Sequence, residues 1–155
     1  MRTALALLAL AGAAVAPASF AAAPSRGDDP SERHRVDVAG ITRSTGSPAP
    51  GTIEDRGTIT GRPFGRGSIV LLATFAEGQK MNGTFEISNR RGTASGTVAT
   101  DYVIEGNEIT FTGTGKLTEG AGRYEGISGK RLKVYDHNTL DGQNGTLTMR
   151  GSARF

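Results

Sequence analysis

Two carboxylic acids and two phenols are candidates for acid–base chemistry because of where they fall in the sequence: Glu86, Asp101, Tyr102 and Tyr124. The first three fall in the middle of predicted strands, and Tyr124 lies in a glycine-rich stretch. A carboxyl group held away from water has a raised pKa and can then act as a general acid or base. These side chains could have that role only if their side of the strand faces an enclosed interior.

Alternation of apolar and polar residues predicts which face Glu86 occupies. Over residues 80–88, Phe85 and Ile87 share one face, and Glu86 lies on the other. Glu86 is therefore expected to face solvent.

The same alternation runs through residues 93–104, where Val98 and Tyr102 share a face and Asp101 lies opposite. Asp101 is therefore also expected to face solvent. Tyr124 is expected to be a packing residue with a polar tip.

Other catalytic or metal-binding arrangements have little support in the sequence. The chain has no cysteine, which excludes disulfides, thiolate metal ligands and cysteine nucleophiles. Its two histidines, His34 and His137, are far apart, whereas metal sites need clustered ligands. Asp136, His137 and Asp141 are expected to form a polar turn. We therefore predict no metal site and no cofactor.

The densest motif is the glycine-rich stretch over residues 111–129. Its glycines are Gly113, Gly115, Gly120, Gly122, Gly126 and Gly129. A dinucleotide-binding loop would need a third glycine where Glu125 stands and a helix after it, and here both flanks read as strands. We interpret the stretch as the end of one strand, a tight turn over 119–122 and a new strand from Tyr124, in which glycines permit positive φ or close approach of strands.

Short alternating runs recur from Gly51 to the end of the chain. They predict strands at 52–60, 68–75, 80–88, 93–104, 108–117, 124–135 and 146–155, with a possible edge strand at 36–41. This spacing is typical of an antiparallel sandwich or barrel. Closure is favoured because the last strand stays apolar up to Phe155. We predict an all-β fold, an antiparallel barrel of about eight strands with no helix after the signal peptide.

Residues 1–21 have the features of a cleaved signal peptide: Arg2, an apolar run over 5–15 and small residues before the cleavage point. The protein is therefore predicted to be secreted or periplasmic, and the alanine-rich signal is typical of bacteria. Residues 22–50 are rich in Pro, Ser and Gly, which predicts a disordered tail. Residues 51–155 remain as the barrel domain.

Charge argues against a nucleic-acid partner. The chain has 18 basic and 15 acidic side chains, interleaved along the sequence, for a net charge of +3. A nucleic-acid-binding protein would concentrate its basic side chains on one stripe.

Residues 113–129 resemble the signature of the allene oxide cyclase-like and dirigent-like barrel family. The matching positions are Gly120, Gly122, Tyr124, Gly126 and Gly129, whereas Glu119 and Ala121 depart from the pattern. The resemblance implies an eight-stranded antiparallel barrel with a central pocket and a tendency to form homodimers or homotrimers. Plant members cyclise an unsaturated epoxide or guide phenoxy-radical coupling. The matching motif is the turn and not the pocket, so the resemblance assigns no catalytic residue.

Three functions remain open on these grounds. The main hypothesis is a secreted barrel that binds an apolar or phenolic small molecule in its interior. An isomerase or cyclase of allene oxide cyclase or dirigent type would use the same cavity and an inward-facing acid or phenol. An extracellular structural module would have a filled barrel. A cavity lined only by aliphatic groups would exclude the enzyme, and a filled interior would exclude both ligand-dependent functions.

Overall fold

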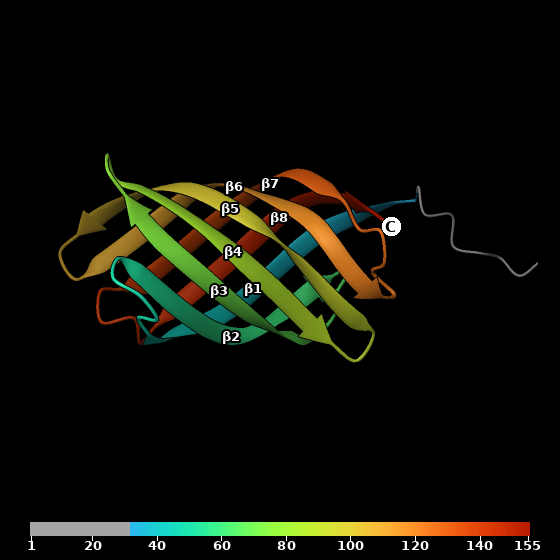
Figure 1. The fold of residues 1–155 in the computed structure, drawn as a ribbon, viewed down its shortest axis with the longest axis horizontal. Helices are drawn as coiled ribbons and strands as arrows, with labels where there is room; N and C mark the ends of the chain where they lie inside the picture. Colours follow the sequence, from blue (N-terminus) through green and yellow to red (C-terminus); the bar gives the residue numbers. More distant parts are fainter. Residues whose placement is uncertain (1–31) are drawn as a thin grey trace, which may run out of the picture.

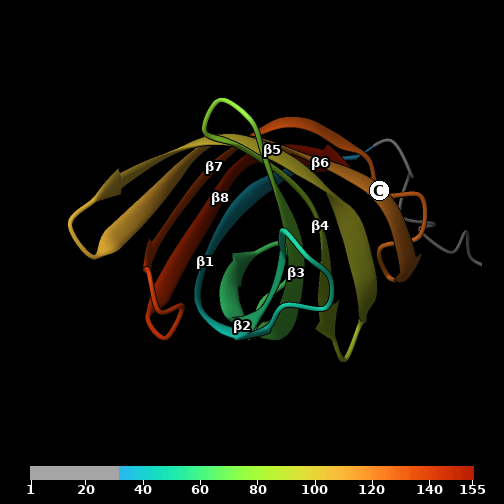
Figure 2. The same cartoon turned by 60° about the vertical axis from the view of Figure 1, so that its left-hand side comes forward.

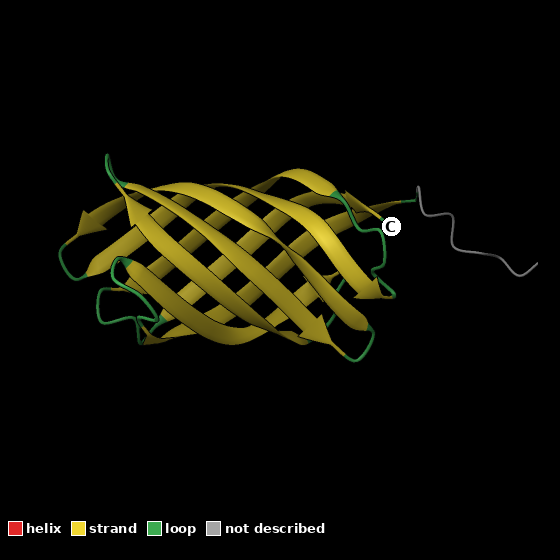
Figure 3. Cartoon of the chain, viewed as in Figure 1, coloured by secondary structure: helices red, strands yellow, loops and turns green. Residues whose placement is uncertain are grey.

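Alternating apolar and polar residues build eight antiparallel strands in the computed structural model, which describes residues 32–155 (Figures 1 and 3). They are β1 (Arg33–Gly46), β2 (Thr52–Arg62), β3 (Gly67–Ala76), β4 (Lys80–Asn89), β5 (Gly92–Glu105), β6 (Glu108–Gly122), β7 (Gly129–Thr139) and β8 (Gly145–Arg154). Each strand pairs with the next, and β8 pairs with β1 to close the barrel. The predicted all-β barrel is confirmed for this part of the chain. The described residues contain no helix, and hence no helical membrane span.

Closure depends on β1, whose residues were predicted to belong to a disordered tail with a possible edge strand at 36–41. That assignment is wrong from Arg33 onward, because β1 pairs with both β2 and β8. Val36 and Val38 are fully buried inside the barrel. Strand pairing on both edges and the burial of these apolar side chains stabilise β1, and a free tail would have neither. The barrel therefore begins well before the predicted boundary at residue 51. The predicted signal peptide and the start of the predicted tail, residues 1–31, lie outside the described residues.

The strands run alternately between the two ends of the barrel, so the loops fall into two sets. The loops after β1, β3, β5 and β7 lie at one end, at the left of Figure 1, which we call the open end. The loops after β2, β4 and β6 lie with the C-terminus at the other end, which we call the closed end. Figure 2 turns the open end toward the viewer.

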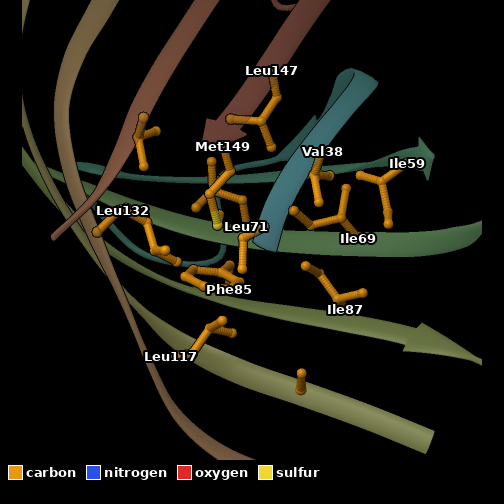
Figure 4. Close-up of a cluster of buried hydrophobic side chains, with 14 of the residues drawn as sticks. Val38, Ile59, Ile69, Leu71, Phe85, Ile87, Leu117, Leu132, Leu147 and Met149 are labelled. Atoms are coloured by element: carbon orange, nitrogen blue, oxygen red, sulfur yellow. The ribbon is translucent and has the colours of Figure 1, made fainter. Parts of the chain in front are cut away.

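The centre of the barrel is filled by side chains from nearly every strand. Leu71, Phe85, Leu147 and Met149 meet on the axis (Figure 4), and each is at least 95% buried. The space left between them is about 10 Å³. That is at most the room needed by one water molecule. The middle of the barrel is therefore a packed core, and the central pocket that the resemblance implies is not found there.

The glycine-rich stretch closes one end of the barrel instead of forming a simple turn. The predicted turn at 119–122 and the predicted strand from Tyr124 are both wrong, because β6 continues to Gly122 and β7 begins at Gly129. Positive φ at Gly122 and Gly126 folds the intervening segment inward. As a result, Tyr124 and Ile127 are fully buried in the closed end. A side chain at Gly120 would collide with the carbonyl oxygen of Tyr124, so glycine is needed there.

Aromatic rings from distant parts of the chain complete this closure. Phe64, from the β2–β3 loop, packs edge-on against Tyr124 with 5.1 Å between ring centroids. Phe155 packs against Tyr124 on another side and stacks on His34. The side-chain amide of Asn89 donates hydrogen bonds to the Phe64 carbonyl oxygen at 2.7 Å and to the Tyr124 hydroxyl oxygen at 2.8 Å. The buried polar groups of the closed end are thereby paired within the protein.

Candidate functional site

A cavity of about 150 Å³ remains inside the open end. One side is apolar and comes from β3, β4 and β6: Leu71, Ala73, Phe75, Met81, Ile109 and Phe111. The other side is polar and comes from β1, β2, β7 and the β7–β8 loop: Ser44, Asp55, Asn138, Thr139 and Asp141. An apolar cavity of about this volume holds one benzene molecule, whereas drug-sized ligands need about 300 Å³ or more. The cavity therefore fits a single ring.

The β7–β8 loop forms part of the cavity wall and is held at both sides. The Ser44 N–H donates a hydrogen bond to the Gly142 carbonyl oxygen at 2.7 Å, which ties the loop to β1. The Leu140 N–H donates to the Asn107 carbonyl oxygen at 2.9 Å, which ties the loop to the β5–β6 hairpin. The wall on this side is therefore anchored by backbone hydrogen bonds.

Three polar side chains reach the interior because they lie on the inward side of their strands. Asp55 follows Ile53 on the inner face of β2 and lines the cavity. Asp136 and Asn138 follow Val134 on the inner face of β7. Asn138 lines the cavity, and Asp136 lies one inward position deeper along β7.

Asp136 is the most deeply buried acid of the described residues, with 3% of its surface exposed. Its pKa is raised to about 7, first because burial penalises the charged form and second because Asp55 carries a like charge nearby. The Asn138 amide donates a hydrogen bond to Asp136 Oδ2 at 3.2 Å, which opposes this shift. Asp136 Oδ1 is buried and has no hydrogen-bond partner within residues 32–155.

Asp55 is partly buried, and its pKa is also raised. Burial raises the pKa of Asp55, and a hydrogen bond with Ser44 opposes the rise. Because the two carboxyl groups repel each other when both are charged, they lose their protons in separate steps. Over an interval of pH the pair therefore holds one proton and one negative charge.

Two of the inward polar side chains of the open end meet at Gly145 on β8, outside the lining of the cavity. A side chain at this position would collide with Asn138 Oδ1 and Thr42 Oγ1, so both side chains converge over the glycine. Thr42 Oγ1 is buried and, within the described residues, lacks a hydrogen-bond partner. An unpaired buried polar group costs about 1–3 kcal/mol. Thr42 and Asp136 thus contribute two unpaired oxygen atoms to this end of the barrel.

Aromatic rings form one edge of the cavity. Phe75 and Phe111 line it, with 6.1 Å between their centroids. Tyr102 packs behind both rings, 5.4 Å from Phe75 and 5.8 Å from Phe111. This wall of the cavity is therefore aromatic, and the cavity is not lined only by aliphatic groups.

The acids selected from the sequence lie on the outer surface, the side that the alternation predicts. Glu86 is exposed and accepts a hydrogen bond from Ser88 at 3.2 Å. Asp101 is exposed and forms an ion pair with Lys80 at 2.8 Å. Neither lines the cavity.

The two tyrosines selected from the sequence lie at opposite ends of the barrel. Tyr102 is half-buried at the open end, behind the cavity wall, and Tyr124 is buried in the closed end. The structure therefore brings none of the four sequence candidates together.

Asp55, Asp136 and Asn138 were not predicted as site residues, although the sequence holds a signal for each. Asp55 has the same parity as Ile53 and Ile59, the apolar residues of its strand. Asp136 and Asn138 continue the inward parity of Leu132 and Val134, but the predicted strand ended at residue 135 and the next residues were assigned to a loop. Since β7 continues to Thr139, period two carries these side chains into the barrel.

Of the residues predicted to form a polar turn, Asp141 lies in the turn after β7, but Asp136 and His137 do not. They extend β7, so Asp136 points inward and His137 points outward. His137 hydrogen-bonds with Thr110 and lies 3.7 Å from Glu108. Within residues 32–155, no group of three or more His, Cys, Asp or Glu side chains is arranged to hold a metal ion.

No protein-family model, curated protein or solved structure matches this chain. The function of the site is therefore inferred from its own geometry and chemistry.

Proposed function

We propose that this protein is an exported β-barrel that binds a small molecule in the open-end cavity, through a ring-sized apolar body and one polar group that donates hydrogen bonds. The cavity itself carries the proposal: about 150 Å³ of space between an aromatic wall and a carboxylate-bearing wall. A barrel used only as a structural module has no need for this space, since the centre and the closed end are filled by side chains.

The expected affinity follows from the size of the cavity. A ring that buries roughly 150–200 Å² of apolar surface would gain about 4–5 kcal/mol at about 25 cal/mol per Å². A hydrogen bond to a charged group such as Asp55 contributes about 1.5–3 kcal/mol. The two gains sum to about 5.5–8 kcal/mol, and the cost of association, about 4 kcal/mol or more, is subtracted from them.

Native mass spectrometry of the protein purified from its own host tests this proposal. A bound species with about ten non-hydrogen atoms or fewer is expected, and the same spectrum gives the oligomeric state, for which the resemblance predicts a dimer or trimer. Ala73→Leu is the matched variant, because Ala73 lines the cavity and a larger side chain would fill it. Loss of the bound species in this variant supports the site. A bound species that persists would place the ligand elsewhere and overturn the proposal.

Isomerisation or cyclisation in the same cavity is a second candidate function. It is favoured by Asp55, which lines the cavity, and by its partner Asp136, whose pKa of about 7 suits a group that exchanges protons at neutral pH. Turnover of the co-purified compound that falls in Asp55→Asn while the compound still binds would identify an enzyme. Binding without conversion would leave a carrier or receptor.

Export and kinship are part of the same proposal. Export is supported by the signal-like residues 1–21, and N-terminal sequencing of the mature protein should begin near residue 22. A start at Met1 would contradict it. Kinship with the allene oxide cyclase-like and dirigent-like barrels is supported by the eight-stranded antiparallel barrel and by the glycine-rich stretch.

A further inference from the structure

The charges around the open-end cavity are all of one sign. Asp55 and Asp141 are its charged lining residues, and Asp136 lies just beneath its floor. Among residues 32–155, no lysine, arginine or histidine lines the cavity. An anionic ligand would therefore meet repulsion from every charged group of the site.

The nearest basic side chains on the surrounding strands lie on the outer face of the barrel. Arg43 on β1 and Arg56 on β2 are exposed, and Arg56 forms an ion pair with Glu54 at 2.7 Å. Lys80 on β4 is engaged with Asp101 in the same way, at 2.8 Å. His137 on β7 lies 3.7 Å from Glu108. None of these basic side chains lines the cavity or pairs with the carboxyl groups inside.

A ligand that brings its own positive charge would supply what the interior lacks. Carboxylates that are taken out of water need a partner of opposite charge or a proton. An ammonium group has up to three N–H donors and fits the acceptor Asp55. Its apolar body would lie against Phe75 and Phe111, whose ring faces also attract cations within about 6 Å. A neutral alcohol of the same size would gain the apolar contacts but not the charge pairing.

The fold separates charges that are interleaved in the sequence. Acidic residues gather at the open end: Glu54, Glu77, Asp101, Glu105, Glu108 and Asp141. They outnumber the basic residues there, which are Arg43, Arg56 and Lys80. Around the three loops of the closed end, basic residues outnumber the acidic ones, which are Glu119 and Glu125. The basic residues there are Arg62, Arg66, Arg90, Arg91, Arg123, Lys130 and Arg131. Such a field concentrates cations at the open end and raises their rate of association.

We infer, on the basis of the proposed function, that the natural ligand of the open-end cavity is a cationic amine, a protonated ammonium group on a ring-sized apolar body. Successive loops lie at opposite ends of the barrel, so a chain of low net charge has an acidic open end. Asp55 adds a carboxyl group inside the cavity at that end.

Three probes of nearly equal size and different charge test this inference: benzylamine, benzyl alcohol and benzoate. Their dissociation constants are measured by isothermal titration calorimetry at pH 7.5 with protein purified from its own host. Benzylamine is expected to bind at least about 10-fold more tightly than benzyl alcohol. A tenfold change in the dissociation constant corresponds to about 1.4 kcal/mol, the size of one modest ion pair. Benzoate is expected to bind more weakly than benzyl alcohol.

Two variants separate the local charge from the charge of the whole open end. Asp55→Asn keeps the shape of the cavity and should bring the affinity for benzylamine to within about 3-fold of that for benzyl alcohol. Benzyl alcohol should lose affinity less than benzylamine does, because the amide oxygen of the variant still accepts a hydrogen bond from its hydroxyl group. Retained benzyl alcohol binding also shows that the variant is folded. Asp101→Asn is the matched control, because Asp101 lies at the same end but on the outer surface, and it should keep the preference for benzylamine.

The outcomes distinguish this inference from the proposed function. Benzyl alcohol that binds the unaltered protein as tightly as benzylamine would overturn the cationic ligand and leave the cavity as a binding site. An unchanged benzylamine preference in Asp55→Asn would also overturn it. If none of the three probes binds and no small molecule co-purifies, the proposed function itself is wrong.

Discussion

The two ends of this barrel differ in how completely side chains fill the interior and in whether the buried polar atoms are hydrogen-bonded. At the closed end, rings from three separate segments fill the barrel, and the amide of Asn89 satisfies the Tyr124 hydroxyl oxygen. At the open end, a cavity of about 150 Å³ remains, and Asp136 Oδ1 and Thr42 Oγ1 are buried without partners within the described residues. One end has been optimised for packing, whereas the other retains polar groups that packing alone does not favour.

The difference indicates where stability and function lie. Buried carboxyl groups with raised pKa values lower the stability of the folded state at neutral pH, and such groups are typical of functional sites. The same sheet could have placed apolar side chains at Asp55 and Asp136, as it does at neighbouring inward positions. We therefore expect changes at the closed end to affect mainly folding, and changes at the open end to affect mainly binding.

Removing the central ring of the closed end should have the largest effect on stability. Tyr124→Ala should lower the free energy of unfolding by about 3–5 kcal/mol, because the side chain is fully buried and packed against Phe64 and Phe155. Urea denaturation provides the measurement. Phe75→Ala, at the half-buried edge of the open end, should cost less. Equal losses of unfolding free energy in Tyr124→Ala and Phe75→Ala would contradict the proposed difference in packing between the two ends.

Gly120→Ala should have the next largest effect, a loss of roughly 2–3 kcal/mol, because the new methyl group would collide with the Tyr124 carbonyl oxygen. Gly126→Ala is the matched control. It meets no atom within 4 Å but has φ of 75°, so backbone strain alone should cost about 1 kcal/mol. If the two variants unfold at the same urea concentration, the closed end is not tightly packed around residue 120.

Asp136→Asn should make the protein more stable at pH 8 by roughly 1–3 kcal/mol. The pKa of Asp136 is about 7 in the folded protein, above its value in the unfolded chain. Between about pH 4 and pH 7 the unfolded chain therefore loses this proton before the folded protein does, and stability falls as pH rises through this window. The asparagine variant should lack that decline. Urea denaturation from pH 4 to pH 8 checks it, and parallel curves for both proteins would show that Asp136 is not buried as described.

Ala73→Leu should have the smallest effect on stability, a change of about 1 kcal/mol or less, because the added atoms enter space that is already empty. Binding of benzylamine should nevertheless be lost. Thermal denaturation and calorimetry measure the two quantities on the same sample. A stable variant that still binds would place the ligand outside the open-end cavity.

Much of the fold was predictable because period-two alternation is strong in this chain. It correctly placed Glu86 and Asp101 on the outside, and it predicted strands close to β3, β4 and β5. The errors came where polar residues occupy inward positions or where apolar residues leave the sheet. β7 was cut short because Asp136 and Asn138 are polar, and Tyr124 was assigned to a strand although it enters the closed end from a loop.

The candidate site was less predictable because its parts come together only through closure of the barrel. Asp55 and Asp136 are far apart in the sequence and lie on β2 and β7, with β1 and β8 between them. The segment of β1 was predicted as a tail with at most an edge strand at 36–41, whereas the barrel closes only because β1 pairs with both β2 and β8. The acidic open end was hidden for a related reason, since successive hairpin loops alternate between the two ends.

A ¹H–¹⁵N NMR titration with benzylamine tests the central claim most directly, because it reports on both ends in one experiment. The backbone signals of Ser44, Asp55 and Phe111, which line the cavity, should shift and saturate together. Those of Phe64, Tyr124 and Ile127, in the closed end, should remain in place. Shifts centred on the closed end, or spread evenly over both ends without saturation, would contradict a binding site in the open end.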